Sequence, residues 1–211
     1  MMQTPAPRRH PSQVRAKLTV DRILQAAEAL IAEEGAGELK MRKIALRAEI
    51  PIGSLYMYFP NREAIMRAIT DHYHALIDAS LEETVAAIHA PQDLLAIIGQ
   101  SVDEYYNFIR TTPAILNLWT GSAYNQVLAQ LSIEDSQRTA QIFFQAALPF
   151  LSPVQAERAL PGFLVCVDMI GSISLVAARL SGEEGENAVQ EMKRMIMLYA
   201  ADLLDIETVP V

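Results

Sequence analysis

The chain has 211 residues, of which 51% are hydrophobic and 7% aromatic, enough apolar material for the core of one large or two modest domains. No stretch of about 20 uncharged apolar residues occurs, since Asp168 interrupts the best candidate, residues 162–178, so we expect no membrane span. Residues 1–17 have no apolar core of signal-peptide type, and a single cysteine, Cys166, excludes an internal disulfide, which together predict a cytoplasmic protein.

Charge is distributed unevenly along the chain, whose net formal charge is −8. Residues 1–67 hold 11 Lys and Arg against 7 Asp and Glu, a net charge of +4, whereas residues 68–211 hold 6 against 18, a net charge of −12. A basic head on an acidic body is typical of a protein that meets phosphate groups at one end. The alternative is a chance clustering of solvated charges.

The first 18 residues are rich in proline and basic side chains, and we expect them to form a flexible basic arm. Such an arm either lies along phosphates or in a minor groove, or is a plain solvated tail. We expect Thr19 to be the N-cap of a helix that runs to about Glu34 and is ended by Gly35.

Two short segments with apolar residues at helical spacing follow, over residues 41–48 and 52–59. Because about four residues separate them, they have the layout of a helix-turn-helix. The second segment is short, yet it carries Tyr56, Met57 and Tyr58, a set that suggests a surface made for contact. Leu55 and Phe59 are expected to face the core.

The residues of this region resemble the DNA-binding domain of TetR-family transcriptional regulators over positions 19–67. The runs that carry the resemblance are Ile23-Leu-x-Ala26-Ala27, Leu30-Ile-x-Glu-x-Gly35, Met41-Arg42-x-Ile44-Ala45, Gly53-Ser54-Leu55-Tyr56-x-Tyr58-Phe59 and Asn61-Arg62-Glu63-Ala64. The resemblance implies an all-α protein. It would have an N-terminal three-helix DNA-binding domain with a helix-turn-helix over 19–67, and a larger helical domain for effector binding and dimerisation over 68–211.

The sequence departs from the family pattern at the turn and at two helix starts. Glu49 stands where the turn usually holds Gly, which adopts a positive φ freely. Pro51 and Ile52 replace a polar cap and a polar or basic residue, so position 52 offers only apolar contact, for instance to a thymine methyl group. Lys40 replaces a capping Thr or Ser, at a cost of ~1 kcal/mol and with a phosphate contact in exchange.

We expect the helix over 52–59 to lie in a major groove, with phosphate contacts from its hydroxyls and from nearby basic residues. Gly53 would let the backbone approach the DNA, and Met57 would lie over a base. Tyr56 either packs inward or binds a phosphate. The residues predicted to bind DNA are Lys40, Arg42, Lys43, Ile52, Gly53, Ser54, Tyr56, Met57, Tyr58 and Arg62.

A long helix is predicted from Asn61, its N-cap, to about Ala90. His72 and His74 lie on it two positions apart and so on different faces, which argues against a metal site that uses both; we expect no metal or other cofactor. Further helices are predicted over 91–111, 113–121, 124–150, 153–180 and 185–205. Pro161 should kink or split the fourth of these, and a break before Glu134 is an alternative in the third.

Aromatic side chains of the body gather on neighbouring helices. They form either ordinary core or the lining of an apolar pocket whose polar groups include Arg110, Asn117 and Tyr124. The resemblance favours the pocket, since family members usually bind a small effector among these helices. The predicted pocket residues are Tyr105, Phe108, Asn107, Trp119, Phe143, Phe144, Cys166 and Met169. Asp168, inside an apolar run, is interpreted as a buried helix partner, an interface residue or an effector contact.

The last helix places apolar residues at alternating spacings of three and four, which is typical of a coiled-coil seam. Its partner helix carries small residues that permit close approach. Two such helices from each of two chains would form a two-fold four-helix interface. The predicted interface residues are Gly171, Ser174, Ala178, Met192, Ile196 and Tyr199. The alternative is packing within one chain.

Together these features predict a homodimeric transcriptional regulator, a repressor that a small hydrophobic effector releases from a palindromic operator in double-stranded DNA. Two alternatives remain open at this stage. One is a regulator that acts through protein contacts after losing DNA binding. The other is an all-helical enzyme, for which the sequence shows no nucleophile–base pair, metal-ligand cluster or phosphate-binding loop. No membrane partner is expected.

Overall fold

The computed structural model describes residues 11–121, 125–180 and 182–206, in which every regular element is a helix. The predicted all-α class is therefore confirmed. In chain order the elements are α1 Pro11–Glu34, η1 Ala36–Glu38, α2 Met41–Arg47, α3 Ile52–Tyr58, α4 Arg62–Val85, α5 Pro91–Thr111, α6 Pro113–Thr120, α7 Gln126–Ala147, η3 Leu148–Phe150, α8 Pro153–Ala177 and α9 Gly182–Leu203.

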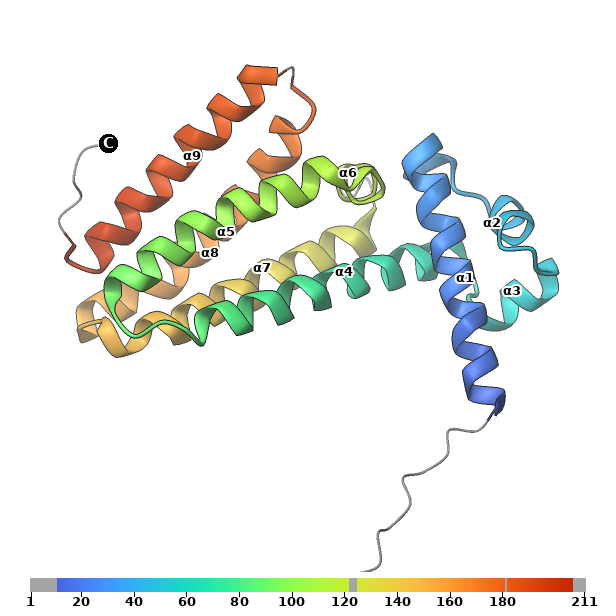
Figure 1. The fold of residues 1–211 in the computed structure, drawn as a ribbon, viewed down its shortest axis with the longest axis horizontal. Coiled ribbons are helices and arrows are strands. Elements are labelled where there is room, and N and C mark those ends of the chain that lie inside the picture. Colours follow the sequence, from blue (N-terminus) through green and yellow to red (C-terminus); the bar gives the residue numbers. More distant parts are fainter. Residues whose placement is uncertain (1–10, 122–124, 181, 207–211) are drawn as a thin grey trace, which may run out of the picture.

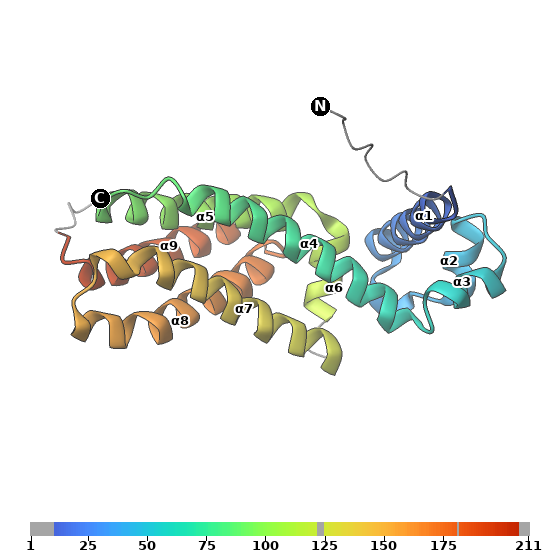
Figure 2. The same ribbon diagram turned by 90° about the horizontal axis from the view of Figure 1, so that it is seen from below.

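Helices α1, α2 and α3 form a head at one end of an elongated molecule, and α4 runs from this head into the body (Figure 1). Viewed from below, α4 passes along α7 in the body while α6 lies next to the head (Figure 2). Ile23, Ile44 and Leu55 are fully buried in the head, and their core is continuous with Ile115 of α6. Residue 67, where we predicted the boundary between domains, therefore lies inside a continuous helix and beside a continuous core.

The N-terminal helix begins earlier than its sequence signals indicated. We predicted a flexible arm to residue 18 and an N-cap at Thr19, but α1 starts at Pro11. The Thr19 hydroxyl instead donates to the carbonyl of Arg15, 2.9 Å away and one turn earlier, so it bonds within the helix instead of capping it. Proline suits a first helical position because it has no N–H to leave unsatisfied. Residues 1–10 of the predicted arm lie outside the described part of the chain.

Two predicted helix breaks are absent. Helix α8 is continuous through Pro161, and α7 is continuous from its cap at Asn125 to Ala147. Pro161 leaves the Glu157 carbonyl without its helical partner, and both residues are exposed, on the solvent side of the helix. As a result α8 has 25 residues and is long and apolar enough to cross a bilayer by length and composition, a test that a core helix of a soluble protein also passes.

The apolar seam of α9 is used inside the chain. Val189, Met192 and Ile196 pack in the core of the body, where each is at most 3% exposed, together with Phe163 of α8. We predicted Met192 and Ile196 at a dimer interface, and this was wrong. An apolar seam of this kind predicts that another helix packs against it but does not indicate which one. Here α5 and α8 of the same chain pack against it.

The turn between α2 and α3 has the backbone conformation expected from the family pattern, but without its usual glycine. Glu49 has a φ of 54°, in the left-handed region that side chains with a Cβ adopt at a cost. We expect Glu49→Gly to raise the free energy of unfolding by about 0.5–1 kcal/mol, because it removes this strain. Urea denaturation would measure the gain, and Glu49→Ala, which keeps the Cβ, should show none.

Candidate functional site

Helix α3 presents an apolar and aromatic surface to solvent. Leu55 and Phe59 are buried as predicted, which turns Ile52, Tyr56 and Met57 outward, the last of them 83% exposed. The two alternatives for Tyr56 are thus decided in favour of exposure. A Cβ built on Gly53 would meet no atom within 4 Å, so nothing inside the head requires a glycine there. Exposed large apolar side chains on so short a helix mark an interaction surface.

Several of the basic residues predicted to contact phosphates already form ion pairs with acidic neighbours. Lys43 forms an ion pair with Glu34, and Lys40 lies 3.7 Å from Glu38. Arg62 contacts its neighbour Glu63, and it also donates to the backbone carbonyls of Gly37 (3.1 Å) and Leu39 (3.4 Å) in the loop before α2. Arg62 therefore holds that loop, and its contact with phosphate stays a prediction.

Arg42 differs from these residues. It is exposed at the start of α2 and pairs with no carboxylate in the described part of the chain. Lys40 caps no helix donor with its side chain, in agreement with the expected loss of a cap. At the other end of the motif the Asn61 side chain accepts from the backbone N–H of Ala64 at 2.8 Å, which confirms the predicted cap of α4.

A large cavity of about 690 Å³ lies in the body, with walls from α4, α5, α7 and α8 and an end at α6. Four of the predicted pocket residues line it: Tyr105, Phe108, Trp119 and Phe143. Trp119 is at the centre of the aromatic group, with its ring centroid 6.3 Å from that of Tyr105 and 6.1 Å from that of Phe108. A cavity of this volume and composition is suited to a small organic molecule.

Two polar atoms in the cavity lining are buried without a hydrogen-bond partner among the described residues. They are the Nε1 of Trp119 and the Oγ1 of Thr70, whose residue is only 2% exposed. A buried donor that is left unpaired costs about 1–3 kcal/mol. Neighbouring atoms cover both of them, so a bound molecule would reach them only after the lining side chains move.

A group of ionisable side chains lies between α4 and α7. Arg138 bonds both Asp78 and Asp135, and the Nδ1 of His74 is 3.4 Å from an Asp135 carboxylate oxygen. Burial, assisted by the charge of Arg138, lowers the pKa of His74 to about 4, while burial raises the pKa of Asp135 to about 6 despite Arg138. At neutral pH the imidazole is therefore uncharged, and its contact with Asp135 is not an ion pair.

The pKa of His74 predicts a pH-dependent stability. Below pH 6.5 the unfolded chain protonates this histidine, whereas the folded chain does not until about pH 4. The unfolded state therefore binds more protons, and stability falls as the pH is lowered through this range. Relative to His74→Gln, we expect the wild type to lose about 1.5 kcal/mol of unfolding free energy between pH 6.5 and pH 5. Urea titrations of both proteins at the two pH values would measure it, and parallel curves would contradict a buried neutral imidazole.

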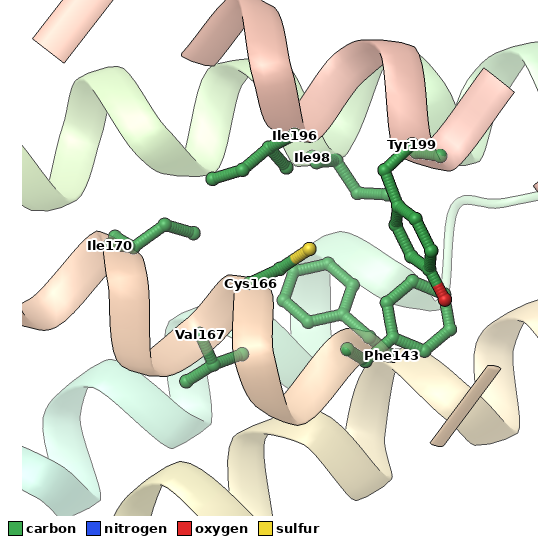
Figure 3. A pocket seen from close by; sticks show the side chains of 9 residues that line it. Ile98, Phe143, Cys166, Val167, Ile170, Ile196 and Tyr199 are labelled. Carbon is green, nitrogen blue, oxygen red and sulfur yellow. The ribbon is translucent and has the colours of Figure 1, made fainter. Parts of the chain in front are cut away.

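The other predicted pocket residues lie outside the large cavity. Asn107 is exposed, and Phe144 and Met169 pack in the core of the body. Cys166 points into a separate space of about 20 Å³ among Ile98, Ile196 and Tyr199 (Figure 3). That volume holds at most one water molecule. Burial raises the pKa of the Cys166 thiol to about 11, so this cysteine is protonated and packs as an apolar side chain.

Two further polar residues singled out in the sequence have different positions from those expected. Asp168 is exposed on α8 at the cavity wall, so it is not a buried acid. Arg110 is exposed and contacts Asn107. Tyr124 lies outside the described residues.

Sequence reasoning missed the contribution of α4 to the cavity. Its residues there are Thr70, Tyr73, His74, Leu76, Ile77, Ser80, Leu81 and Thr84. They mix small hydroxyls with apolar side chains along one side of the helix, a weaker pattern than a continuous apolar stripe. This mixed face was the available signal, since a fully packed helix face has few hydroxyls.

Helix α6 joins the cavity to the head. Trp119 lines the cavity, while Asn117, two residues earlier, donates to the backbone carbonyls of Ile31 (3.0 Å) and Ala32 (3.4 Å) near the end of α1. Ile115 and Leu118 of α6 are fully buried in the core of the head. Helix α6 therefore contacts both the cavity and α1.

The outer face of α8 and α9 is apolar and exposed. Val165 on α8 is 65% exposed, and Met195 and Leu198 on α9 are 57% and 47% exposed. Only 22% of the most apolar 18-residue window of α8 is buried. The predicted interface residues of α8 do not belong to this face: Gly171 lines the cavity, Ser174 is fully buried and Ala178 packs against the core of the head.

Comparison with known families identifies both parts of the chain. Residues 23–69 match the family described as bacterial regulatory proteins, tetR family, and residues 92–203, more than half of the chain, match the tetracyclin repressor-like C-terminal domain. The chain belongs to the TetR family. This TetR-family protein is therefore a transcriptional regulator with a helix-turn-helix DNA-binding domain, and not an enzyme.

Curated relatives agree with this assignment over part of the chain. YvdT of Bacillus subtilis, an uncharacterised HTH-type transcriptional regulator, is 27% identical over 86 residues, which are 41% of this chain and 43% of YvdT. The HTH-type transcriptional repressor KstR of Mycobacterium tuberculosis is 31% identical over 80 residues, 37% of this chain and 36% of KstR. The chain thus matches about a third to a half of the length of such relatives.

Solved structures share the fold over nearly the whole chain. A TetR-family transcriptional regulator from Streptomyces coelicolor aligns with a TM-score of 0.69 at 22% identity, covering 88% of this chain and 99% of that one. RolR, solved in complex with resorcinol, aligns with a TM-score of 0.58 at 16% identity over 94% of this chain and 97% of RolR. At these identities the likeness concerns the fold alone.

Proposed function

We propose that this TetR-family protein is a homodimeric repressor that binds a palindromic operator through α3 and leaves it when a small molecule occupies the large cavity. The observation that carries the proposal is the combination of two surfaces on one chain: an exposed recognition helix, and a cavity whose end helix, α6, is bonded to α1 of the head. A regulator of this kind works in the cytoplasm, where bacterial DNA is.

On the DNA side, Ile52, Tyr56 and Met57 would meet base edges or sugars, and Arg42 would reach a phosphate without breaking an internal ion pair. Lys43 would have to exchange Glu34 for a phosphate. Because Lys40, Lys43 and Arg62 already have partners among the described residues, we expect base contacts and α3 packing to add to the affinity. The salt dependence should still be steep, since each phosphate contact releases a counterion.

Selection of bound sequences from a random duplex pool, at low and moderate salt, tests DNA binding. We expect enrichment of a site with two-fold symmetry, whose half-sites lie about 34–36 Å apart or a multiple of that spacing. No enrichment at either salt, from protein shown to be folded, would contradict the proposal and would favour a regulator that acts through protein contacts.

On the effector side, the cavity and the DNA-binding surface must be linked energetically. If an effector releases the protein from DNA, it must bind the free protein more tightly than the DNA-bound protein. The contacts of α6 with α1 and the passage of α4 from cavity to head offer two physical routes for this linkage. Calorimetric titration of an effector into free protein and into the operator complex should give different affinities, and equal affinities would refute the mechanism.

The exposed apolar face of α8 and α9 fits a second copy of the chain, because an operator with two half-sites needs two heads and because apolar patches of this kind favour association. We expect Leu198→Glu or Val165→Glu to convert the dimer into a monomer, since each would bury a carboxylate against apolar surface. Light scattering after size-exclusion chromatography would measure the mass. Gln92→Glu, an equal charge change at an exposed position of α5, should remain dimeric.

A further inference from the structure

Acidic and aromatic side chains, without basic ones, give the large cavity its electrostatic character. Its described lining includes the acids Glu104, Asp135 and Asp168, and no lysine or arginine. His74, the remaining ionisable side chain that could carry positive charge there, is neutral at physiological pH because burial lowers its pKa to about 4. An anion in this cavity would meet only like charges, which costs free energy.

Arg138 does not reverse this balance. It lies outside the cavity lining and bonds two carboxylates, those of Asp78 and Asp135, so the three groups together keep a negative charge. One Asp78 oxygen is also buried without a partner among the described residues. Additional positive charge near these carboxylates would therefore be stabilising.

The aromatic end of the cavity has the same preference. The rings of Trp119 and Tyr105 are nearly parallel, with an interplanar angle of 13°, and the His74 ring centroid lies 5.3 Å from that of Trp119. The faces of such rings attract cations, most strongly at tryptophan.

We infer that the cavity binds an organic cation, mainly apolar and aromatic, whose charge lies between the lining carboxylates and the face of Trp119. The ligand class is an onium ion or a protonated amine carrying one or more rings, for which about 690 Å³ provides room. This inference rests on the proposed function, in which the cavity is the effector site. It excludes carboxylate, phosphate and acyl-phosphate effectors.

Tetraphenylphosphonium and tetraphenylborate test the inference because they have nearly the same shape and opposite charges. Trp119 is the single tryptophan of the chain and lines the cavity, so its fluorescence reports binding without a label. Titrating each ion into the full-length protein, we expect the phosphonium to quench Trp119 and to bind more tightly than the borate by at least about tenfold. Equal binding of the two ions, tighter binding of the borate, or no binding of either would overturn the inference.

Variants localise the charge preference. Glu104→Gln with Asp168→Asn removes two lining carboxylates that are exposed, so the fold should be kept. We expect this double variant to bind the phosphonium about tenfold more weakly. The matched control, Glu157→Gln with Glu186→Gln, removes two exposed carboxylates that lie outside the lining and pair with no cation among the described residues, and it should bind like the wild type. Equal phosphonium affinities in the two double variants would contradict the assignment.

Operator binding by the same preparations separates this inference from the proposed function. If the protein binds its selected duplex but does not distinguish the two ions, the ligand class is wrong and the repressor proposal stands. If the phosphonium binds with the expected preference but no duplex is selected, the cavity assignment stands and the repressor proposal fails.

Discussion

Met57→Glu is expected to weaken operator binding by about a hundredfold or more, because it places a carboxylate where α3 meets DNA. Met57 is 83% exposed and contributes little to the core, so the folded state should keep its stability. A carboxylate within a few ångströms of phosphates and base acceptors adds repulsion and loses an apolar contact. Fluorescence anisotropy with the selected duplex, at constant salt, would measure the affinity.

Two controls make this result specific to α3. Helix α5 begins at the end of the body away from the head (Figure 1), and Gln92→Glu in its first turn adds the same charge there, so this variant should bind the operator like the wild type. Met57→Leu keeps an apolar side chain of similar size and should retain most of the affinity. Operator binding by Met57→Glu at wild-type strength would mean that α3 does not lie in the groove.

Gly185→Ala is expected to give the largest loss of stability. A Cβ at this position of α9 would lie 2.3 Å from the backbone oxygen of Ala177 in α8, and 3.3 Å from the hydroxyl of Tyr106. Backbone cannot move aside as a side-chain tip can, so α9 must shift from α8. We expect a loss of about 3 kcal/mol, or about 6–12 °C in Tm, measured by thermal unfolding at one fixed protein concentration.

Gly37→Ala is the matched control for this substitution. A Cβ there would meet no atom within 4 Å, and Gly37 does not have a positive φ, so its Tm should stay close to that of the wild type. If the Tm of Gly185→Ala equals that of the wild type, α8 and α9 are not in the close contact described.

The local features of the head could be predicted from the sequence because their causes lie within a few residues. The cap at Asn61 depends on one side chain and the N–H of Ala64, and the strained turn at Glu49 depends on the length of the connection between α2 and α3. The outward orientation of Met57 follows from helical periodicity once Leu55 and Phe59 are taken as core. Such features need no knowledge of what packs elsewhere.

Contacts between distant segments could not be predicted in the same way. Lys43 pairs with Glu34 and Arg62 holds the carbonyls of Gly37 and Leu39 only because α1, α2 and α4 meet in space. Sequence spacing identified the basic residues, but it did not identify the carboxylates and backbone carbonyls that form ion pairs and hydrogen bonds with them. For this reason, only Arg42 among the predicted basic contacts remains without a carboxylate partner in the described residues.

The cavity shows a similar limit. Aromatic composition predicted Tyr105, Phe108, Trp119 and Phe143 correctly, since large rings on adjacent helices must converge. It also included Cys166, which faces a different and far smaller space, and it omitted α4. Two residues of one helix that are a few positions apart can face different neighbours. Only the packing of whole helices decides which neighbour each residue contacts.

By itself the sequence determined the fold class, the helix-turn-helix and the amphipathic character of the last two helices. Tertiary structure alone decided which partner covers each apolar face. The seam of α9, with Met192 and Ile196, packs inside the chain, whereas the exposed residues of α8, with Val165, are left for another surface. The physical reason is that periodicity fixes the side of a helix that must be buried, and burial is equally favourable against the same chain or against a second one.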